Sequence, residues 1–292
     1  MIKVPGKVLT EKDLDSFIAI LTEHTGIVPR AGHREGIKNF IERKLDESHL
    51  SKEEYKRKLS TDKLLISEFV NKSTVNETYF FREEKHFAVL RDKIFPQMAM
   101  NNQDKKVKIL SAACSYGEEA YSLSVMASLC GLKPEVTASD INSAVMEHCK
   151  NGLFLGTSLR SVDGVRFHTL VLPYRREDGR VAFPESIRKT VNTINLNLCE
   201  LDLLSNAELL PKEQNLIFIR NVFIYFSFEL RAKILKTIAE KCLAEDGYLF
   251  VSMNEIAQLD FDLVPDSLVK ESEGNVFYFH KKSVKKGGKA NG

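Results

Sequence analysis

The chain has 292 residues, of which 43% are hydrophobic and 28% are charged, and its formal net charge is only +2. This is an ordinary globular composition, and the small charge argues against functions that need a strongly basic surface, such as nucleic-acid binding. The five cysteines are scattered and form no C-x-x-C pair, so we expect reduced thiols in an intracellular protein. No segment is apolar enough to span a membrane or to act as a secretory signal, so we expect a cytoplasmic protein without membrane insertion.

The first quarter of the chain carries mainly helix signals. Thr10, followed by acidic residues and by apolar residues at helical spacing, is typical of a helix start, and Gly26 of a helix end. Ser51 and Glu54 form the capping-box pattern at the start of a later helix. About four helices are predicted, and we expect them to form a small all-helical domain over residues 1–73.

The second of these helices, expected from about Glu35 to Leu45, is basic. Its cations are Arg34, Lys38, Arg43 and Lys44. A solvated helix face balanced by nearby glutamates is the favoured interpretation. The alternative is a docking face for an acidic partner helix.

A dense cluster of polar and aromatic residues follows in the sequence NETYFFR. We accept Phe81 as a core residue. Asn76, Thr78 and Arg82 closely precede the first predicted strand, so we expect them to fold over the mouth of a site there. In the alternative interpretation, Thr78 caps a helix and Arg82 is a surface cation.

The segment KILSAACSYGEEAY (Lys108–Tyr121) predicts a buried strand, a turn of small residues that ends at Gly117, and a helix that begins with Glu118 and Glu119. In open α/β sheets, a nucleotide-like cofactor lies against the turn after the first strand. This turn lacks the glycine spacing of dinucleotide loops and the Walker pattern, and its carboxylates would repel a phosphate. An acidic turn suits a cationic cofactor such as S-adenosylmethionine, although glutamate-capped turns also occur without any cofactor.

Two further strand ends carry polar side chains. Asp140 follows the second predicted strand, where an acid accepts hydrogen bonds from ribose hydroxyls; it also precedes a helix and can cap it. Arg220 and Asn221 follow the apolar strand Asn215–Ile219, and Tyr225 comes shortly afterwards. Carboxyl ends of parallel strands meet at one edge of a sheet, so we expect these residues at one site.

The segment between these strands interrupts the α/β alternation. An Asp-Gly turn between short β-rich runs predicts a hairpin, so we expect an inserted antiparallel β flap near residues 158–195. Such a flap suits a macromolecular substrate, and a purely structural lid is an equal alternative. The basic, glycine-rich residues 283–292 are expected to form a disordered tail.

Four ordered motifs resemble the chemotaxis receptor methyltransferase family of the CheR type. They are NETYFFR (Asn76–Arg82), SAACSYGEEAYS (Ser111–Ser122), ASDI (Ala138–Ile141) and IRNVFIYF (Ile219–Phe226). The resemblance implies an α/β fold, with a Rossmann-like class I S-adenosylmethionine-dependent methyltransferase domain over residues 74–282. It also implies methyl transfer to glutamate side chains of chemoreceptor (methyl-accepting chemotaxis protein) signalling helices, with S-adenosylhomocysteine as the product.

The resemblance also implies the site residues. The matching cofactor positions are Asn76, Thr78, Arg82, Glu119, Asp140, Asp202, Leu203, Arg220 and Asn221, and the positions nearest the transferred methyl group are Arg82 and Tyr225. No metal is expected, because the seven histidines are scattered and none is paired at metal-ligand spacing. The chain departs from the family pattern at Ala120, where proline is usual, and at Met253–Glu255.

Three other functions remain open from the sequence. A methyltransferase could act on RNA or a small molecule, although no basic stripe favours RNA. A non-catalytic protein could keep the pocket as an S-adenosylmethionine sensor or adaptor. A dehydrogenase on the same fold is least favoured, because the glycine fingerprint is missing.

Overall fold

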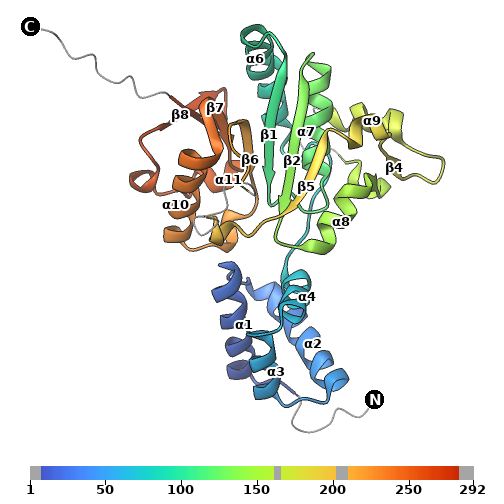
Figure 1. The fold of residues 1–292 in the computed structure, drawn as a ribbon, viewed down its shortest axis with the longest axis vertical. Helices are drawn as coiled ribbons and strands as arrows, with labels where there is room; N and C mark the ends of the chain where they lie inside the picture. Colours follow the sequence, from blue (N-terminus) through green and yellow to red (C-terminus); the bar gives the residue numbers. More distant parts are fainter. Residues whose placement is uncertain (1–7, 161–165, 202–209, 283–292) are drawn as a thin grey trace, which may run out of the picture.

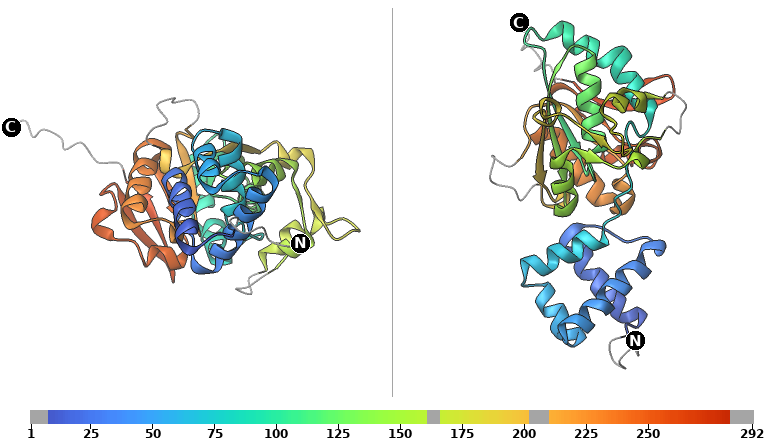
Figure 2. Two further views of the ribbon diagram at one scale, coloured as in Figure 1. Left: turned by 90° about the horizontal axis from the view of Figure 1, so that it is seen from below. Right: turned by 90° about the vertical axis from the view of Figure 1, so that its right-hand side faces the viewer.

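A computed structural model of the protein describes residues 8–160, 166–201 and 210–282. The chain forms a small helical part, which lies at the carboxyl-terminal edge of a larger sheet-containing part (Figures 1 and 2). The tail expected over residues 283–292 lies outside the described residues.

The helical part consists of α1 (Glu11–Thr25), α2 (Ala31–Ser48), α3 (Lys52–Leu59) and α4 (Lys63–Ser73). Both predicted helix starts are present as capping boxes, Thr10 with Asp13 and Ser51 with Glu54. The four helices bury a hydrophobic cluster of their own, which includes Phe17, Leu21, Ile41, Tyr55 and Phe69. Helix α2 is longer than predicted at both ends.

Three cations of α2 are engaged within the helical part. Arg34 pairs with Glu11 and Asp15, Arg43 pairs with Glu47, and Lys44 pairs with Glu47 and Glu68. These contacts agree with the favoured interpretation of a solvated helix face whose charges are locally balanced.

The larger part is built on a seven-stranded sheet with the order β5-β2-β1-β6-β7-β9-β8. The strands are β1 (Lys106–Ala112), β2 (Lys133–Asp140), β5 (Val191–Asn195), β6 (Gln214–Ile219), β7 (Leu243–Phe250), β8 (Leu268–Glu273) and β9 (Val276–Lys281). Neighbouring strands are parallel except for β9, which runs antiparallel to β7 and β8. This arrangement confirms the Rossmann-like class I methyltransferase fold.

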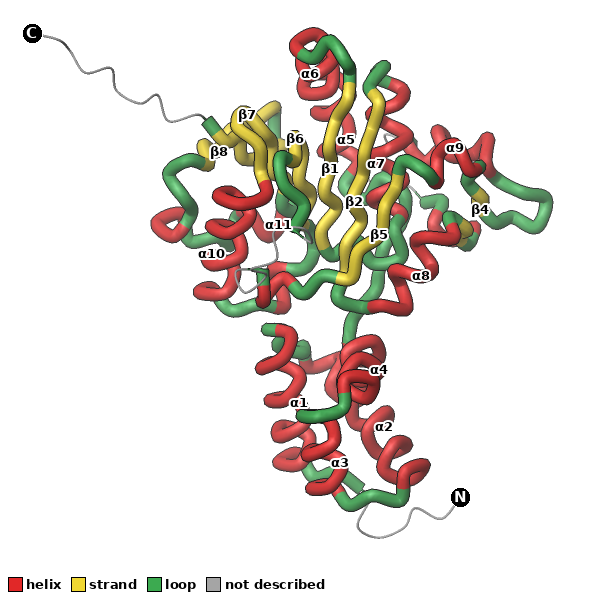
Figure 3. The backbone as a smooth tube through the Cα atoms, viewed as in Figure 1, coloured by secondary structure: helices red, strands yellow, loops and turns green. Residues whose placement is uncertain are grey.

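Helices cover both faces of this sheet (Figure 3). They are α5 (Glu84–Val89), α6 (Phe95–Asn101), α7 (Glu118–Leu129), α8 (Ser143–Asn151), α9 (Glu185–Arg188), α10 (Phe228–Thr237) and α11 (Met253–Ile256). Successive residues of β6 alternate between two hydrophobic clusters: Leu216 and Phe218 pack with the α5–α8 side, and Ile217 and Ile219 pack with α10. Burial on both faces explains why β6 reads as a continuous apolar run.

The expected flap is present in a shorter form. Strand β3 (Leu153–Phe154) pairs antiparallel with β4 (Val181–Ala182), and Asp178–Gly179 lies in the turn before β4. The last part of the 158–195 segment is not flap, because Val191–Asn195 forms edge strand β5 of the central sheet. Aromatic stacking of Tyr121 on Phe183, with ring centroids 4.5 Å apart, attaches the flap to α7.

Two elements have features that the sequence analysis does not indicate. Helix α10 leaves α geometry at Thr237 and continues as a π-helical turn, Ile238–Cys242, which leads directly into β7 at Leu243. Strand β8 was not predicted, because its sequence LVKESE belongs to a mostly exposed edge strand with little apolar signal.

Gly117 and Gly36 offer a matched pair for testing the cofactor-turn backbone. Gly117 has φ 104°, and an added Cβ would collide with the sulfur of Cys149, whereas a Cβ on Gly36 in α2 meets nothing within 4 Å. We expect Gly117→Ala to lower the free energy of unfolding by roughly 1–3 kcal/mol. Gly36→Ala should raise it by about 0.5–1 kcal/mol. Urea unfolding of both variants checks this, and equal effects would contradict the structure.

Candidate functional site

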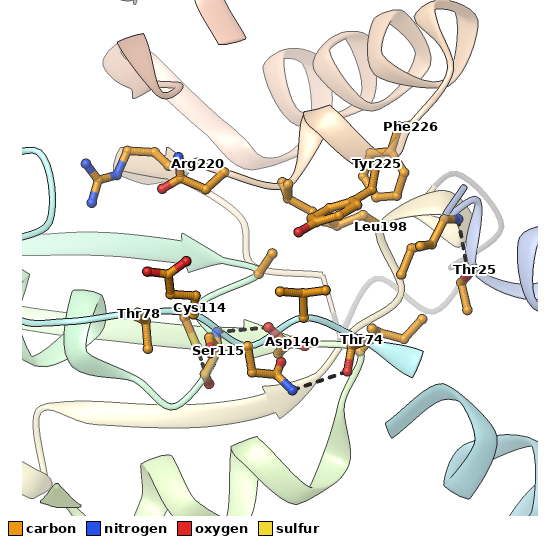
Figure 4. A pocket seen from close by; sticks show the side chains of 18 of the residues that line it. Thr25, Thr74, Thr78, Cys114, Ser115, Asp140, Leu198, Arg220, Tyr225 and Phe226 are labelled. Carbon is orange, nitrogen blue, oxygen red and sulfur yellow. Dashed lines mark hydrogen bonds between the residues drawn. The ribbon is translucent and has the colours of Figure 1, made fainter. Parts of the chain in front are cut away.

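A pocket of about 980 Å³, counted out to the solvent, opens at the carboxyl ends of β1, β2 and β6. Its walls come from four parts of the chain: the end of α1 and start of α2, residues 73–82, the strand ends, and residues 220–226. In Figure 4, Arg220 and Tyr225 lie on one side of the space, and Ser115, Asp140 and Thr78 lie on the other.

The turn after β1 places Glu119 in the pocket wall. Glu119 Oε1 accepts a hydrogen bond from Ser111 Oγ at 2.6 Å, and Oε2 accepts one from Arg220 Nε at 2.8 Å. Glu118 turns away, because its Oε1 accepts from Ser158 Oγ at 2.7 Å and burial raises its pKa. Of the two adjacent carboxylates, only Glu119 lines the pocket among the described residues.

Asp140 lies at the end of β2 and is 7% exposed. Its carboxylate accepts hydrogen bonds from the backbone N–H groups of Ser115 and Asn142, each at 2.9 Å. Burial raises the pKa of Asp140, and these hydrogen bonds partly oppose that rise. The alternative role as a helix cap is wrong, since the side chain of Asn142 caps α8.

The segment before α5 lines the pocket through Asn76, Thr78 and Arg82. Thr78 is not a helix cap, because α5 begins after Glu83, whose side chain makes no capping bond. Phe81 is fully buried, as predicted, and its N–H donates to Ser122 Oγ at 3.0 Å. The guanidinium of Arg82 donates to the carbonyl oxygen of Glu77 at 2.7 Å.

Arg220 is a buried cation, and its side chain is 1% exposed. Besides Glu119, its guanidinium contacts the carbonyl oxygen of Arg82 at 2.8 Å, His86 Nδ1 at 3.1 Å and Glu83 Oε2 at 3.5 Å. Arginine is effectively always protonated, so it is the donor to His86. Arg220 is therefore an internal cation with several partners, in agreement with its expected position at the sheet edge.

The loop from Asn221 to Tyr225 is held by Glu255. This carboxylate is 1% exposed and accepts from the N–H groups of Asn221 at 2.8 Å and Ile224 at 3.2 Å. Tyr225 reaches into the pocket from this loop, and burial raises the pKa of its hydroxyl (Figure 4). Met253–Glu255, where the chain departs from the family pattern, thus supplies the carboxylate that supports the loop.

The helical part closes one end of the pocket, which the sequence alone did not indicate. Thr25, Ile27, Pro29 and His33 line the pocket, and the N–H of Val28 donates to the carbonyl oxygen of Tyr225 at 2.8 Å. Helix spacing predicted these helices but contained no signal for where they pack.

The structure brings most predicted site residues together. Those that line the pocket are Asn76, Thr78, Arg82, Glu119, Asp140, Arg220, Asn221 and Tyr225. Asp202 and Leu203 lie outside the described residues. Sequence reasoning missed Glu83 and His86, which contact Arg220 from behind the pocket wall; their position beside NETYFFR was the only available signal.

The pocket has the chemistry to hold a cationic nucleoside. Glu119 and Asp140 provide carboxylates, and the buried hydroxyl of Ser115 has no hydrogen-bond partner among the described residues. Among all the residues that the structure describes, no group of three His, Cys, Asp or Glu side chains could hold a metal ion.

None of the helices in the described ranges is long and apolar enough to cross a membrane.

Comparison with known families identifies this pocket. The protein-family model described as "CheR methyltransferase, SAM binding domain" matches residues 76–264, which include every predicted site residue. The chain belongs to the CheR methyltransferase family. Residues 76–264 are therefore an S-adenosylmethionine-binding domain, in agreement with the cofactor predicted from the acidic turn.

Curated members of the CheR family extend the match over most of the chain. A chemotaxis protein methyltransferase of Campylobacter jejuni is 30% identical over 89% of this chain and 91% of its own length. Chemotaxis protein methyltransferase 1 of Vibrio cholerae is 35% identical over 64% of this chain and 66% of its own. A chemotaxis protein methyltransferase of Borreliella burgdorferi is 30% identical over 67% of this chain and 70% of its own length.

His86 gives a pH-dependent test of the buried cluster behind the pocket. Burial lowers its pKa well below the ordinary value of 6.5, and the Arg220 cation acts in the same direction. The unfolded chain therefore binds a proton that the folded protein excludes. The free energy of unfolding should fall as the pH drops below about 6.5, by up to about 1.4 kcal/mol per pH unit.

The matched variant is His86→Asn, which retains an oxygen acceptor for Arg220 but does not titrate. We expect its stability to depend less on pH, although it will be lower overall because a buried ring is lost. Urea unfolding between about pH 7 and pH 5 measures both slopes. Identical slopes for the two proteins would contradict the buried, neutral state of His86.

Proposed function

We propose that this protein methylates glutamate side chains of chemoreceptor signalling helices, as part of adaptation in chemotaxis. Support for the substrate comes from the family and from the convergence of Arg82 and Tyr225 on the pocket that contains Glu119 and Asp140. A receptor cytoplasmic domain as substrate would place the reaction in the cytoplasm. We also propose that residues 1–73 and 74–282 act as a docking domain and a catalytic domain.

The cofactor roles follow the chemistry of the pocket. Bound S-adenosylmethionine supplies an electrophilic methyl group on a positively charged sulfur. In our proposal Glu119 attracts the cationic part of the ligand, and Asp140 accepts hydrogen bonds from its ribose. Asn76, Thr78, Arg220 and Asn221 complete the binding wall, and Asp202 and Leu203 are assigned to the adenine.

With S-adenosylmethionine bound, an acceptor carboxylate would take the methyl group by an in-line displacement, in which the electron pair of the carbon–sulfur bond would leave with sulfur. A glutamate with a pKa of about 4.3 is already ionised near neutral pH, so the protein needs no strong general base. Its task is to align the reactants and exclude water, which lowers barriers by roughly 7–11 kcal/mol in favourable cases. Arg82 is proposed to hold the acceptor carboxylate, and Tyr225 to shape the methyl-transfer position.

The deciding experiment incubates the protein with methyl-labelled S-adenosylmethionine and a receptor cytoplasmic fragment. We expect label on the fragment that is released by mild base, because carboxyl methyl esters hydrolyse under those conditions. Base-stable label would instead indicate a different acceptor atom. Tight cofactor binding without any transfer would favour the sensor or adaptor function.

Removal of the Arg82 guanidinium tests its role as the acceptor clamp. We expect Arg82→Ala to lower kcat/KM for the receptor fragment by roughly 100-fold, because the acceptor loses charge-assisted hydrogen bonds and alignment. Arg91→Ala is the control, since Arg91 is an exposed arginine paired with Asp92. Wild-type rates in Arg82→Ala would remove Arg82 from the mechanism.

A further inference from the structure

Glu83 lies directly behind the pocket and connects two of its walls. It follows Arg82 in the chain, yet its side chain contacts residues at the ends of β6 and β7. It is not one of the described residues that line the pocket. Its position therefore suits an indirect role, in which it acts through its neighbours.

The backbone of Glu83 is in an unusual conformation for a residue with a side chain. Its φ is 57° and its ψ is 61°, in the left-handed region. This conformation costs a non-glycine residue about 1–2 kcal/mol, so the surrounding structure must maintain it. Strained residues of this kind concentrate at functional sites, which is a reason to ask what the side chain does.

Three hydrogen-bond donors face the carboxylate of Glu83, and its Oε2 also lies 3.2 Å from His86 Nδ1. Its Oε1 accepts from Asn221 Nδ2 at 3.3 Å, while Oε2 lies 3.3 Å from the N–H of Met253 and 3.5 Å from Arg220 Nη1. A carboxylate only accepts hydrogen bonds, so it matches this set. A glutamine of the same shape would turn an amide N–H₂ toward at least one donor.

These contacts complete the set of partners around Arg220. Glu119 binds one end of the guanidinium from the pocket side, and Glu83 contacts the other end from behind. Because the guanidinium is planar and rigid, fixing its far end also fixes the end that meets Glu119. Glu83 thereby ties the segment that carries Arg82 to Arg220 and Asn221.

We propose that Glu83 is a positioning residue for methyl transfer, which holds Arg220 and Asn221 in register with Arg82 and Glu119. The effect of Glu83 on kcat rests on the proposed function, whereas its effect on cofactor binding does not. The expected consequence of losing this carboxylate lies in the geometry of the pocket, because Glu83 holds groups that line it.

The test compares Glu83→Gln with wild type and with Glu245→Gln. Glu245 is an exposed carboxylate that pairs with Lys281 at 2.9 Å, so it undergoes the same chemical change away from the pocket. For Glu83→Gln we expect the Kd for S-adenosylmethionine, measured by calorimetry, to rise about tenfold and kcat to fall by at least that factor. Glu245→Gln should match wild type, and the receptor KM should change little in both variants.

Three outcomes decide the proposal. Wild-type cofactor affinity and kcat in Glu83→Gln would overturn it, and so would a loss that disappears after correction for the folded fraction. If Glu83→Gln does not fold, Glu83→Asp takes its place: it keeps the charge but is one methylene shorter. It should remain folded and still bind S-adenosylmethionine several-fold more weakly, and wild-type affinity would overturn the proposal.

The same experiment separates this proposal from the proposed function. A wild-type protein that binds S-adenosylmethionine but labels no receptor fragment would refute the proposed substrate. The comparison of cofactor Kd values between wild type and Glu83→Gln would still decide the role of Glu83.

Discussion

The burial of the Arg220 guanidinium is the constraint on which the site depends. A cation with a side chain that is 1% exposed needs partners that replace its lost hydration. Glu119 from the first helix after β1, the carbonyl of Arg82, His86 from α5, and Glu83 provide them. Satisfying one arginine therefore brings three chain segments together at the carboxyl end of β6. The pocket forms where those segments meet.

The price of this convergence is visible in the backbone. Phe81, Glu83, Ala113, Ser115 and Asn221 all have positive φ, and all lie in or beside the segments that form the pocket. Each such residue costs of the order of 1–3 kcal/mol, which the two large hydrophobic clusters of the sheet must offset. In exchange, the walls are fixed before any ligand arrives, which suits a reaction governed by alignment.

The sequence predicted features that depend on local pattern. The helix starts at Thr10 and Ser51 follow from capping rules, and β6 follows from its apolar run. Prediction from the sequence failed for features that depend on packing between distant segments. Asp140 resembled a helix cap, but Asn142 takes that role because both oxygens of Asp140 are already engaged by backbone N–H groups. Strand β8 was missed because an exposed edge strand needs few apolar residues. The acidic turn predicted the cofactor. The spacing of apolar residues in the N-terminal helices, in contrast, did not indicate that these helices form one wall of the pocket.

The two arginines of the site differ in the charge of their partners, and this difference supports the roles proposed for them. Arg220 is held by the carboxylates of Glu119 and Glu83, so its charge is largely balanced inside the protein. Among the described residues, the Arg82 guanidinium instead donates to a neutral carbonyl, that of Glu77. A substrate carboxylate that approached Arg220 would compete with the carboxylates of Glu119 and Glu83. At the contact between Arg82 and the Glu77 carbonyl, it would compete with no anion. Within the proposed function, charge complementarity therefore favours Arg82 over Arg220 as the group that would hold an acceptor glutamate, with Arg220 assigned to the cofactor wall.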